Sequence, residues 1–361
     1  MLSAAPHGSD TDNGLVGEQK GAEDLGRQPT VSVGMMLPVG FGIEPPDLLE
    51  LCLAADRRGL HAVGCGELAG PEAFSLMGAA AAATANIRLE TGVVPISSRS
   101  PALLAMAANT LAAVSKDRFV LGIGAGSPIV SSFHADVFER PVHRVAEALA
   151  AIRMALAGER LTDRGGFKLR GIRHRPVRVF LAAMNERMLQ LAAREADGVV
   201  IHFVGAEQMA ELAPRLRRVR AAAGNKAPFE IIALVHAAAG RDGDPERAYR
   251  REMAPYLAVP TYRSLAAGLS SFDEVDAAAE AWHRGGREAA ADIFPPGIAA
   301  ACLAVGRDAI ADRVAGLGRA GCDGVRLVPL STAGADAAPV HDLVDSLAAV
   351  IDDLNVQEVV P

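Results

Sequence analysis

The chain has 361 residues, of which 50% are hydrophobic, 22% charged and only 4% aromatic, and its formal net charge is −7. This length suits two small domains or one large single-core fold, and the apolar fraction is ample for a globular core. The acidic balance and the scarcity of aromatic residues argue against a nucleic-acid-binding protein. The most basic stretch, residues 168–178, is interpreted as a solvated loop face or as a patch that attracts an anionic cofactor tail.

The termini and cysteines bear on the cellular compartment. Residues 1–29 are rich in Gly, Asp, Ser and Glu, which predicts a disordered leader without a signal peptide. We find no uninterrupted apolar stretch of membrane-spanning length, so no membrane partner is expected. The cysteines have neither CxxC nor zinc spacing, which predicts buried free thiols in a cytoplasmic protein; they are Cys52, Cys65, Cys302 and Cys322.

From Thr30 onward, short apolar runs alternate with helical patterns. Strands are predicted at Val31–Leu37, His61–Gly66, Arg88–Val94, Arg118–Ile123, Val177–Ala182, Gly198–His202, Glu230–His236 and Gly324–Val328. Helices are predicted at Asp47–Arg58, Phe74–Thr84, Pro101–Val114, Pro141–Ala157, Glu186–Glu195, Ala206–Ala222, Ala309–Arg319 and Val340–Leu354. A long loop over 124–140 is expected to be functional or disordered.

Strands that alternate with helices require right-handed parallel crossovers, and eight such units indicate an α/β fold of the (β/α)8 TIM-barrel type. A doubly wound open sheet is the alternative, but it would have fewer units and a glycine-rich turn where this chain has Pro38. We predict one barrel domain over residues 30–361, with a helical insertion at about 245–300 before the last strand.

A barrel carries its functional site at the C-terminal ends of its strands. Here those ends are mostly apolar or glycine, which favours a site for a large flat ring over a hydrolase. Gly122, Gly124 and Gly126 recur at every second residue, so on a strand they face one side and leave room for a ring. A glycine bulge at a corner of the barrel is the alternative interpretation. A dinucleotide-binding fingerprint is not supported, because its third glycine is not at the required position and no helix is expected to follow.

A second candidate region, residues 182–188, lies where a strand leads into a helix. Free N–H groups at a helix N-terminus suit a phosphate, with Asn185 as the cap and Arg187 as an added charge. An ordinary capped helix is the alternative. The carboxylate of Glu186 would repel a phosphate if it pointed inward.

Three stretches resemble the signatures of the luciferase-like monooxygenase superfamily, particularly its branch that uses the deazaflavin coenzyme F420. They are Thr91–Pro128, with TGVVPISSRSP and FVLGIGAGSP at its ends, Phe138–Arg153 (FERPVHRVAEALAAIR) and Val179–His202 (VFLAAMNERMLQLAAREADGVVIH). The similarity spans roughly residues 31–235 and returns at Val325–Pro329. Members of this superfamily are TIM barrels that carry FMN or F420 and catalyse monooxygenation or hydride transfer.

The resemblance also implies positions for the cofactor. A non-prolyl cis peptide between Gly92 and Val93 would back the ring. Residues beside the ring and its ribityl chain would be Gly124, Ala125 and Gly126, and the phosphate would be surrounded by Ala183, Met184, Asn185, Glu186, Arg187 and Met188, with His202 nearby.

Two side chains are candidates for catalysis. His134 lies in the long loop, where relatives carry Trp-His, and is either a substrate-facing proton donor or a loop histidine bonded to backbone. Glu67 at a strand end either contacts the ring or substrate or pairs with an arginine. His202 and His236 could bind a metal, but no further ligand completes a site, so no metal is expected.

The function predicted from these residues is an F420-dependent oxidoreductase that transfers a hydride to or from a small organic substrate. Two alternatives are an FMN-dependent monooxygenase served by a separate flavin reductase, and a flavin-binding barrel without catalysis. Sugar-phosphate dehydrogenation is not expected, because Leu68 and Ser127 stand where such relatives have histidine and glutamate. The resemblance implies homodimers through the alanine-rich helices Phe74–Thr84 and Ala102–Val114.

Overall fold

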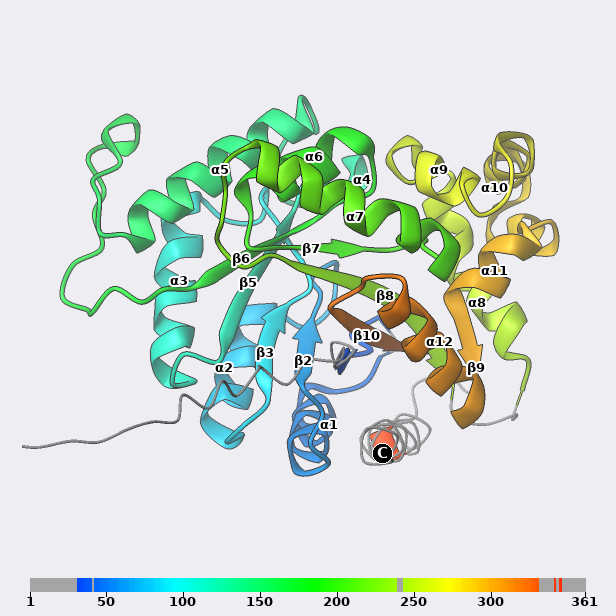
Figure 1. Ribbon diagram of the computed structural model, residues 1–361, viewed down its shortest axis with the longest axis horizontal. Coiled ribbons are helices and arrows are strands. Elements are labelled where there is room, and N and C mark those ends of the chain that lie inside the picture. Colours follow the sequence, from blue (N-terminus) through cyan, green and yellow to red (C-terminus); the bar gives the residue numbers. More distant parts are fainter. Residues whose placement is uncertain (1–30, 41, 239–242, 331–340, 342–343, 346–361) are drawn as a thin grey trace, which may run out of the picture.

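A closed barrel of parallel strands forms the centre of the computed structural model, which describes residues 31–40, 42–238, 243–330, 341 and 344–345. Its strands run in the order β10–β1–β2–β3–β5–β6–β7–β8, and β8 pairs back to β10 (Figure 1). They are β1 (Ser32–Met36), β2 (Ala62–Cys65), β3 (Arg88–Thr91), β5 (Phe119–Gly124), β6 (Arg178–Ala182), β7 (Gly198–Ile201), β8 (Glu230–Ala238) and β10 (Gly324–Pro329). The predicted (β/α)8 barrel is confirmed, and each predicted strand overlaps one of these.

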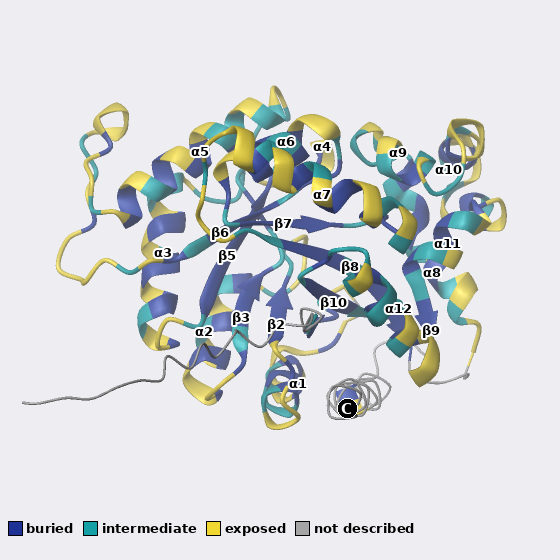
Figure 2. Cartoon of the chain, in the orientation of Figure 1, coloured by how far each residue is buried: buried dark blue, intermediate teal, exposed yellow. Residues whose placement is uncertain are grey.

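Helices surround the barrel and bury one face each against it. Figure 2 shows buried strands inside and helices whose outward faces are exposed. The helices are α1 (Pro45–Arg57), α2 (Ala73–Ala83), α3 (Pro101–Val114), α5 (Pro141–Leu156), α6 (Glu186–Glu195), α7 (Ala206–Ala222) and α12 (Arg307–Arg319). Local signals explain several starts: proline occupies the first turn of α1, α3 and α5, and Ser100 caps α3.

The peptide between Gly92 and Val93 is cis, which confirms the bond geometry that the resemblance implied. The structure differs from the sequence expectation at three other places. The predicted third strand ends at Thr91, and a separate strand, β4 (Val94–Pro95), pairs with β5. The long loop after β5 contains a short helix, α4 (Pro128–Phe133), capped by Ser127. A short strand, β9 (Leu303–Val305), adds to β8 outside the closed barrel. Each of these is too short to give a periodic pattern.

The segment between β8 and β9 is helical. It consists of α8 (Pro245–Leu257), α9 (Pro260–Ala267), α10 (Phe272–Asp292, kinked at Gly286) and α11 (Pro296–Cys302), which gather at one side of the barrel (Figure 1). These helices share an apolar cluster of their own, which continues into the barrel through Met184, Phe203 and Leu330. Because these three residues follow β6, β7 and β10, the insertion packs at the C-terminal end of the strands. The expected leader and almost all of the expected helix 340–354 lie outside the described residues.

Inside the barrel, an apolar layer separates two ends of different character. Val120, Phe180, Val200 and Ile232 form this layer from inward-facing positions of four strands. Towards the N-terminal ends of the strands lies a chain of buried ion pairs. Arg326 contacts both carboxylate oxygens of Glu90 at 2.8 and 2.9 Å, Arg88 joins Glu90 to Glu230, and Arg178 also pairs with Glu230. We call this set the inner ion-pair chain.

Candidate functional site

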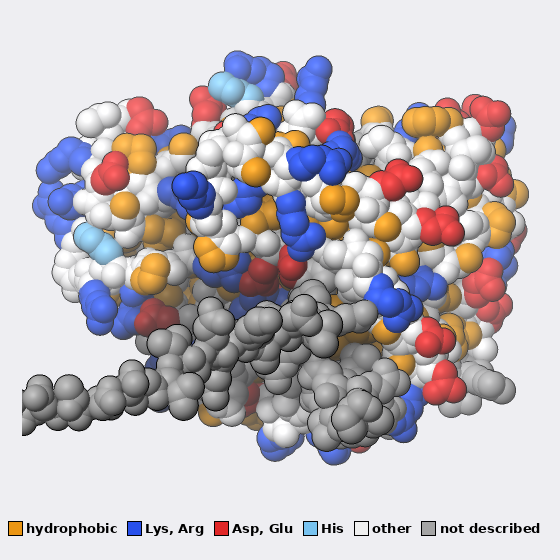
Figure 3. All heavy atoms as spheres, viewed as in Figure 1, with side chains coloured by type: hydrophobic (Ala, Val, Ile, Leu, Met, Phe, Trp, Pro, Cys, Tyr) orange, Lys and Arg blue, Asp and Glu red, His pale blue; other side chains and the backbone are white. Residues whose placement is uncertain are grey.

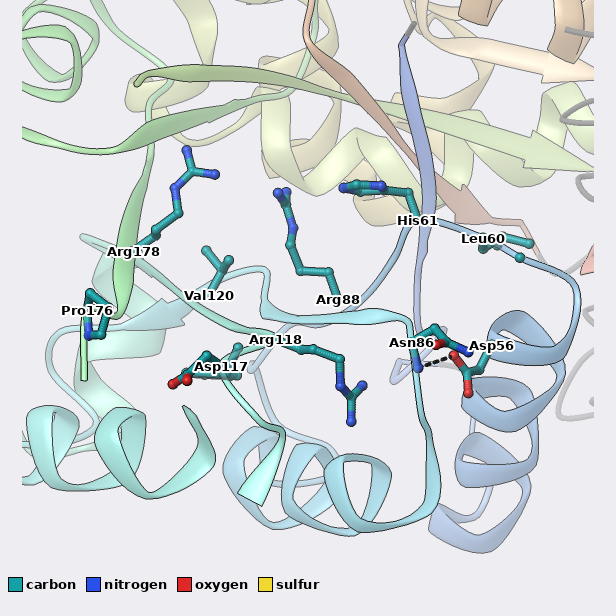
Figure 4. A pocket seen from close by; sticks show the side chains of 12 residues that line it. Asp56, Leu60, His61, Asn86, Arg88, Asp117, Arg118, Val120, Pro176 and Arg178 are labelled. Carbon is teal, nitrogen blue, oxygen red and sulfur yellow. Dashed lines mark hydrogen bonds between the residues drawn. The ribbon is translucent and has the colours of Figure 1, made fainter. Parts of the chain in front are cut away.

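The described part of the chain contains a cavity of about 650 Å³ at the N-terminal end of the strands (Figure 4). Its walls include Arg88, Arg118, Arg178, His61 and Asp56. Arg88 and Arg178 extend into the barrel, where they pair with Glu230. Arg118 turns away and donates to the carbonyl oxygens of Ala81, Thr84, Ile87 and Ser115. Since these guanidinium groups already have partners, they hold the barrel together and are not available to a ligand.

The opposite end, the barrel mouth, contains the residues predicted to lie by a ring. Val93 follows the cis peptide and lies close to Gly124: a Cβ built on Gly124 would come within 2.9 Å of a Val93 methyl and 3.3 Å of the Ala182 Cβ. Gly126 has φ of 73°, which favours glycine. Ala125 packs against the main core. The glycine spacing therefore lets the segment after β3 approach β5 and places Val93 as an apolar wall.

The predicted phosphate region forms the turn between β6 and α6. Asn185 caps α6, its Oδ1 accepting from the Met188 amide at 3.1 Å. Glu186 accepts from Arg215 of α7 and from Gln190, so its carboxylate is held on the outer side of the helix. The amides of Glu186 and Arg187 have no partner within the described ranges, and neither does the exposed Arg187 side chain. Two free amides and one cation thus lie together.

The remaining residues of this region are buried among other side chains. Ala183 and Met188 belong to the main core, whereas Met184 belongs to the apolar cluster of the insertion. The Met184 carbonyl oxygen accepts from the Ser264 hydroxyl of α9 at 3.3 Å. These three residues position the turn that carries Asn185 and Arg187.

Glu67 follows β2 and is held by an arginine. Its two oxygens accept from Arg99 at 2.6 and 2.7 Å, and the Arg99 guanidinium also pairs with Glu72 and lies over the Phe74 ring. Arg99 precedes the cap of α3, Ser100, so the pair ties the β2–α2 and β4–α3 loops together. The arginine pairing considered from the sequence is present, and a catalytic role for Glu67 stays a prediction.

His134 ends the short helix α4. Its side chain is exposed, and the nearby Asp136 is paired with Arg144 at 2.6 Å. It does not belong to the buried groups at the mouth. A proton-donor role for His134 therefore also stays a prediction.

His202, expected near the phosphate, lies beside His236, and its place relative to a phosphate stays a prediction. The ring centroids are 5.1 Å apart, and a carboxylate oxygen of Glu252 on α8 lies 3.8 Å from His236 Nε2. Burial, and then the neighbouring His236, hold the pKa of His202 well below its usual range. Sequence reasoning paired the two histidines only as metal ligands and missed Glu252. The spacing of Tyr249, Glu252 and Tyr256 on one helical face was the signal that could have found it.

The mouth carries groups of the kinds that a flat ring with an anionic tail requires. Val93 and Met184 supply apolar contact, and the hydroxyl of Ser97, in the loop after β4, is buried without a partner in the described structure. The free amides of α6 and Arg187 match the needs of a phosphate. We judge this donor set compatible with a flavin or deazaflavin.

Other ligand classes find less support. No group of three His, Cys, Asp or Glu side chains able to hold a metal occurs in the described ranges. On the face shown in Figure 3, basic and acidic side chains are interspersed. Among the helices that the structure describes, none is both long and apolar enough for a membrane span.

Known proteins match part of the chain in sequence. The chain is 29% identical over 191 residues to a 5,10-methylenetetrahydromethanopterin reductase of Archaeoglobus fulgidus, a match that covers 51% of this chain and 57% of that relative. The matched region thus spans little more than half of the relative's length.

Solved structures share the whole fold. The coenzyme F420-dependent tetrahydromethanopterin reductase of Methanopyrus kandleri superposes with a TM-score of 0.71 at 19% identity, covering 88% of this chain and 97% of that one. The oxygenating constituent of 3,6-diketocamphane monooxygenase of Pseudomonas putida, solved with FMN, gives a TM-score of 0.61 at 18% identity, covering 90% and 98%. At these identities the likeness establishes the fold alone.

A family model decides the relationship. Residues 25–324 match the model described as luciferase-like monooxygenase, which is most of the chain and includes every predicted site residue. The relatives are oxidoreductases and monooxygenases. This chain therefore belongs to the luciferase-like monooxygenase family.

Proposed function

We propose that this protein is an F420-dependent oxidoreductase that transfers a hydride to or from a small organic substrate at the barrel mouth. The observation that carries the proposal is the combination of an apolar wall at Val93 with free amides and an unpaired Arg187 at the start of α6. A flat ring with a phosphate tail needs both. Relatives named as F420-dependent support the choice of cofactor.

The protein's part in this reaction is to bind, orient and exclude water, since the deazaflavin, when bound, supplies the hydride. Val93 would support one ring face, with Gly92, Gly124, Ala125 and Gly126 around it. The turn from Ala183 to Met188 would hold the phosphate through the Glu186 and Arg187 amides. Because Glu186 is held by Arg215, its charge is directed away from that phosphate.

Titration of the purified chain with F420 and with FMN tests this proposal. We expect F420 to bind at least tenfold more tightly than FMN, and its absorbance to change when a substrate is oxidised or reduced. Arg187→Ala should weaken F420 binding about tenfold, the loss of one charge-assisted contact. Arg194→Ala, at the other end of α6, is the matched control and should leave affinity unchanged. Equal loss in both variants would contradict the phosphate placement.

An FMN-dependent monooxygenase served by a flavin reductase is the second candidate, favoured by the likeness to a structure solved with FMN. Tighter binding of FMN, with oxygen consumption after reduction, would establish it. Cofactor binding without redox change for any substrate would instead indicate a flavin-binding barrel without catalysis.

We also propose that the protein is a homodimer through α2 and α3. Leu103, Met106 and Val114 lie on one face of α3 and are 46–47% exposed, beside exposed alanines of α2. Met106→Asp should produce monomers, whereas Met154→Asp on α5 should not. Light scattering at micromolar concentration measures both, and a monomeric wild type would overturn the proposal.

A further inference from the structure

Two imidazoles lie at the mouth on the side of the insertion. His202 directly follows β7 and His236 is on β8, at positions that continue the inward-facing Val200 and Ile232. Their rings are 5.1 Å apart and inclined by 27°. We call them the imidazole pair.

The walls around the imidazole pair are aromatic. Phe203 stacks on His202 at 4.4 Å and 15°, Tyr249 meets His236 edge-on at 5.0 Å, and Tyr256 meets His202 edge-on at 6.2 Å. Phe203 has φ of 52°, a left-handed conformation that is uncommon for an aromatic residue. Such conformations persist where surroundings over-determine them and concentrate at functional sites.

Polar atoms in this aromatic cluster lack partners. His202 Nε2, His236 Nδ1 and Glu252 Oε2 are buried and accept or donate no hydrogen bond within the described structure. His236 is only 2% exposed. A buried polar atom without a partner costs about 1–3 kcal/mol, so several at one place indicate that a polar group of a ligand completes the set.

Charge restricts what this ligand is. Arginines on the neighbouring helices are engaged elsewhere: Arg313 donates to the Ala300 carbonyl, Arg250 pairs with Glu246, and Arg263 pairs with Asp276. Arg287 donates to the Arg251 carbonyl. Among the residues that the structure describes, the ion-pair partner of His236 is the carboxylate of Glu252. An anionic substrate would be repelled there, whereas an uncharged molecule with one polar atom and an apolar body matches the walls.

Resting on the proposed hydride transfer, we propose that His202 is a catalytic base that holds the oxygen of an uncharged alcohol, or of the corresponding ketone. His236 and Glu252 are positioning residues that act through His202.

The reaction balances with the deazaflavin as co-reactant. During oxidation, the alcohol C–H bond breaks and its electron pair leaves as hydride to the oxidised deazaflavin. The O–H bond breaks as well, its proton passes to the neutral imidazole of His202, and a ketone forms. In the reverse direction the ketone gains hydride from the reduced deazaflavin and the proton from His202. Because burial lowers the pKa of His202, the neutral base is present at neutral pH.

The rival assignment, implied by the resemblance, puts His202 beside the cofactor phosphate, and His202→Asn separates the two. Turnover is measured with F420 on cyclohexanol, 2-octanol and their ketones, and with glucose 6-phosphate as a charged comparison. We expect kcat on the uncharged pairs to fall about 100-fold and the F420 Kd to change less than twofold. His143→Asn, an exposed histidine on α5, is the control and should change neither. A parallel loss of F420 affinity, an unchanged kcat, or turnover of glucose 6-phosphate alone would overturn the proposal.

A measurement on the cofactor-free protein tests the proposal even if a variant folds poorly. In ¹⁵N-histidine spectra of the cofactor-free protein, cyclohexanone should shift the His202 resonance and leave that of His143 in place. His236→Asn should raise the measured pKa of His202, and Glu252→Gln should lower kcat about tenfold without changing the F420 Kd. No shift with any of the uncharged ligands refutes the proposal. Failure of the wild type to bind F420 refutes the proposed function instead, so the two failures are distinguishable.

Discussion

Buried carboxylates are paired with arginines at the N-terminal end of this barrel, whereas buried polar atoms at the mouth lack partners in the described structure. At the N-terminal end, the inner ion-pair chain gives every carboxylate an arginine, and Arg326, although 1% exposed, contacts both oxygens of Glu90. At the mouth, His202, His236 and Glu252 keep buried polar atoms without partners. Pairing offsets the free-energy cost of burying a polar group, whereas a buried polar group without a partner lowers stability. This difference indicates that the N-terminal end is structural, and it supports the proposed ligand site at the mouth.

The largest effect should come from breaking the inner ion-pair chain. Burial opposes ionisation of Glu90, but Arg326 and Arg88 hold its pKa at about 2. Glu90→Gln leaves Arg326 without its charged partner and should lower the free energy of unfolding by about 3–5 kcal/mol in urea denaturation. F420 affinity of the folded fraction should not change, because the apolar layer separates the two ends.

Two further variants sharpen this result. Glu147→Gln, on the exposed face of α5, removes a carboxylate that is 57% exposed and should cost less than about 0.5 kcal/mol. The double variant Glu90→Leu/Arg326→Met removes both charges and should recover most of the loss. If Glu90→Gln were as mild as Glu147→Gln, the N-terminal end would not be the structural one.

The opposite result is expected at the mouth. His236→Phe replaces a buried imidazole with an unpartnered Nδ1 by an apolar ring of the kind that surrounds it. The free energy of unfolding should change by less than about 1 kcal/mol or rise, while kcat on an uncharged alcohol falls at least tenfold. Urea denaturation and steady-state kinetics measure the two quantities. A loss of stability above about 2 kcal/mol would show that His236 is paired in solution.

The sequence predicted the barrel because its signals are local. Each strand is a short apolar run, several helices have a proline, serine or asparagine near their start, and right-handed crossovers leave few ways to join them. The boundaries of α3, α6 and α7 match the predicted ones to the residue. β9 and α4 were not predicted, because segments of three and six residues are too short to show a hydrophobic periodicity.

The site was harder to predict because its contacts join distant residues. His202 and Tyr256 are brought together only when the insertion folds onto the mouth. Glu67 contacts Arg99 across two loops. The sequence allowed an arginine partner for Glu67 as one alternative, but the spacing of residues along the chain did not identify it. The glycines of β5 were singled out from their spacing, and the structure adds that Val93 approaches both of them closely. The place of a ring beside Gly124 stays a prediction. Charge partners across a barrel are decided by tertiary packing.

The smallest expected effect is on the pH dependence of the unfolding free energy. Acid should lower this free energy through His202 at the mouth as well as through Glu90. His202 has a pKa well below its usual value near 6.5 in the folded protein, so it stays neutral there but gains a proton in the unfolded chain. Its neutral form therefore contributes stability that is complete above pH 6.5 and is lost as pH falls below it, by at most about 1.4 kcal/mol per pH unit. The groups that face it are His236 from β8 and Tyr256 from α8, with Glu252 behind His236. Burial raises the pKa of Tyr256, which stays protonated.

Between pH 7.5 and 5.5 the unfolding free energy of His202→Asn should fall less steeply than that of the wild type, whereas His143→Asn should follow the wild type. Identical slopes in all three proteins would mean that His202 is solvated and paired, and the contrast between the two ends of the barrel would be lost.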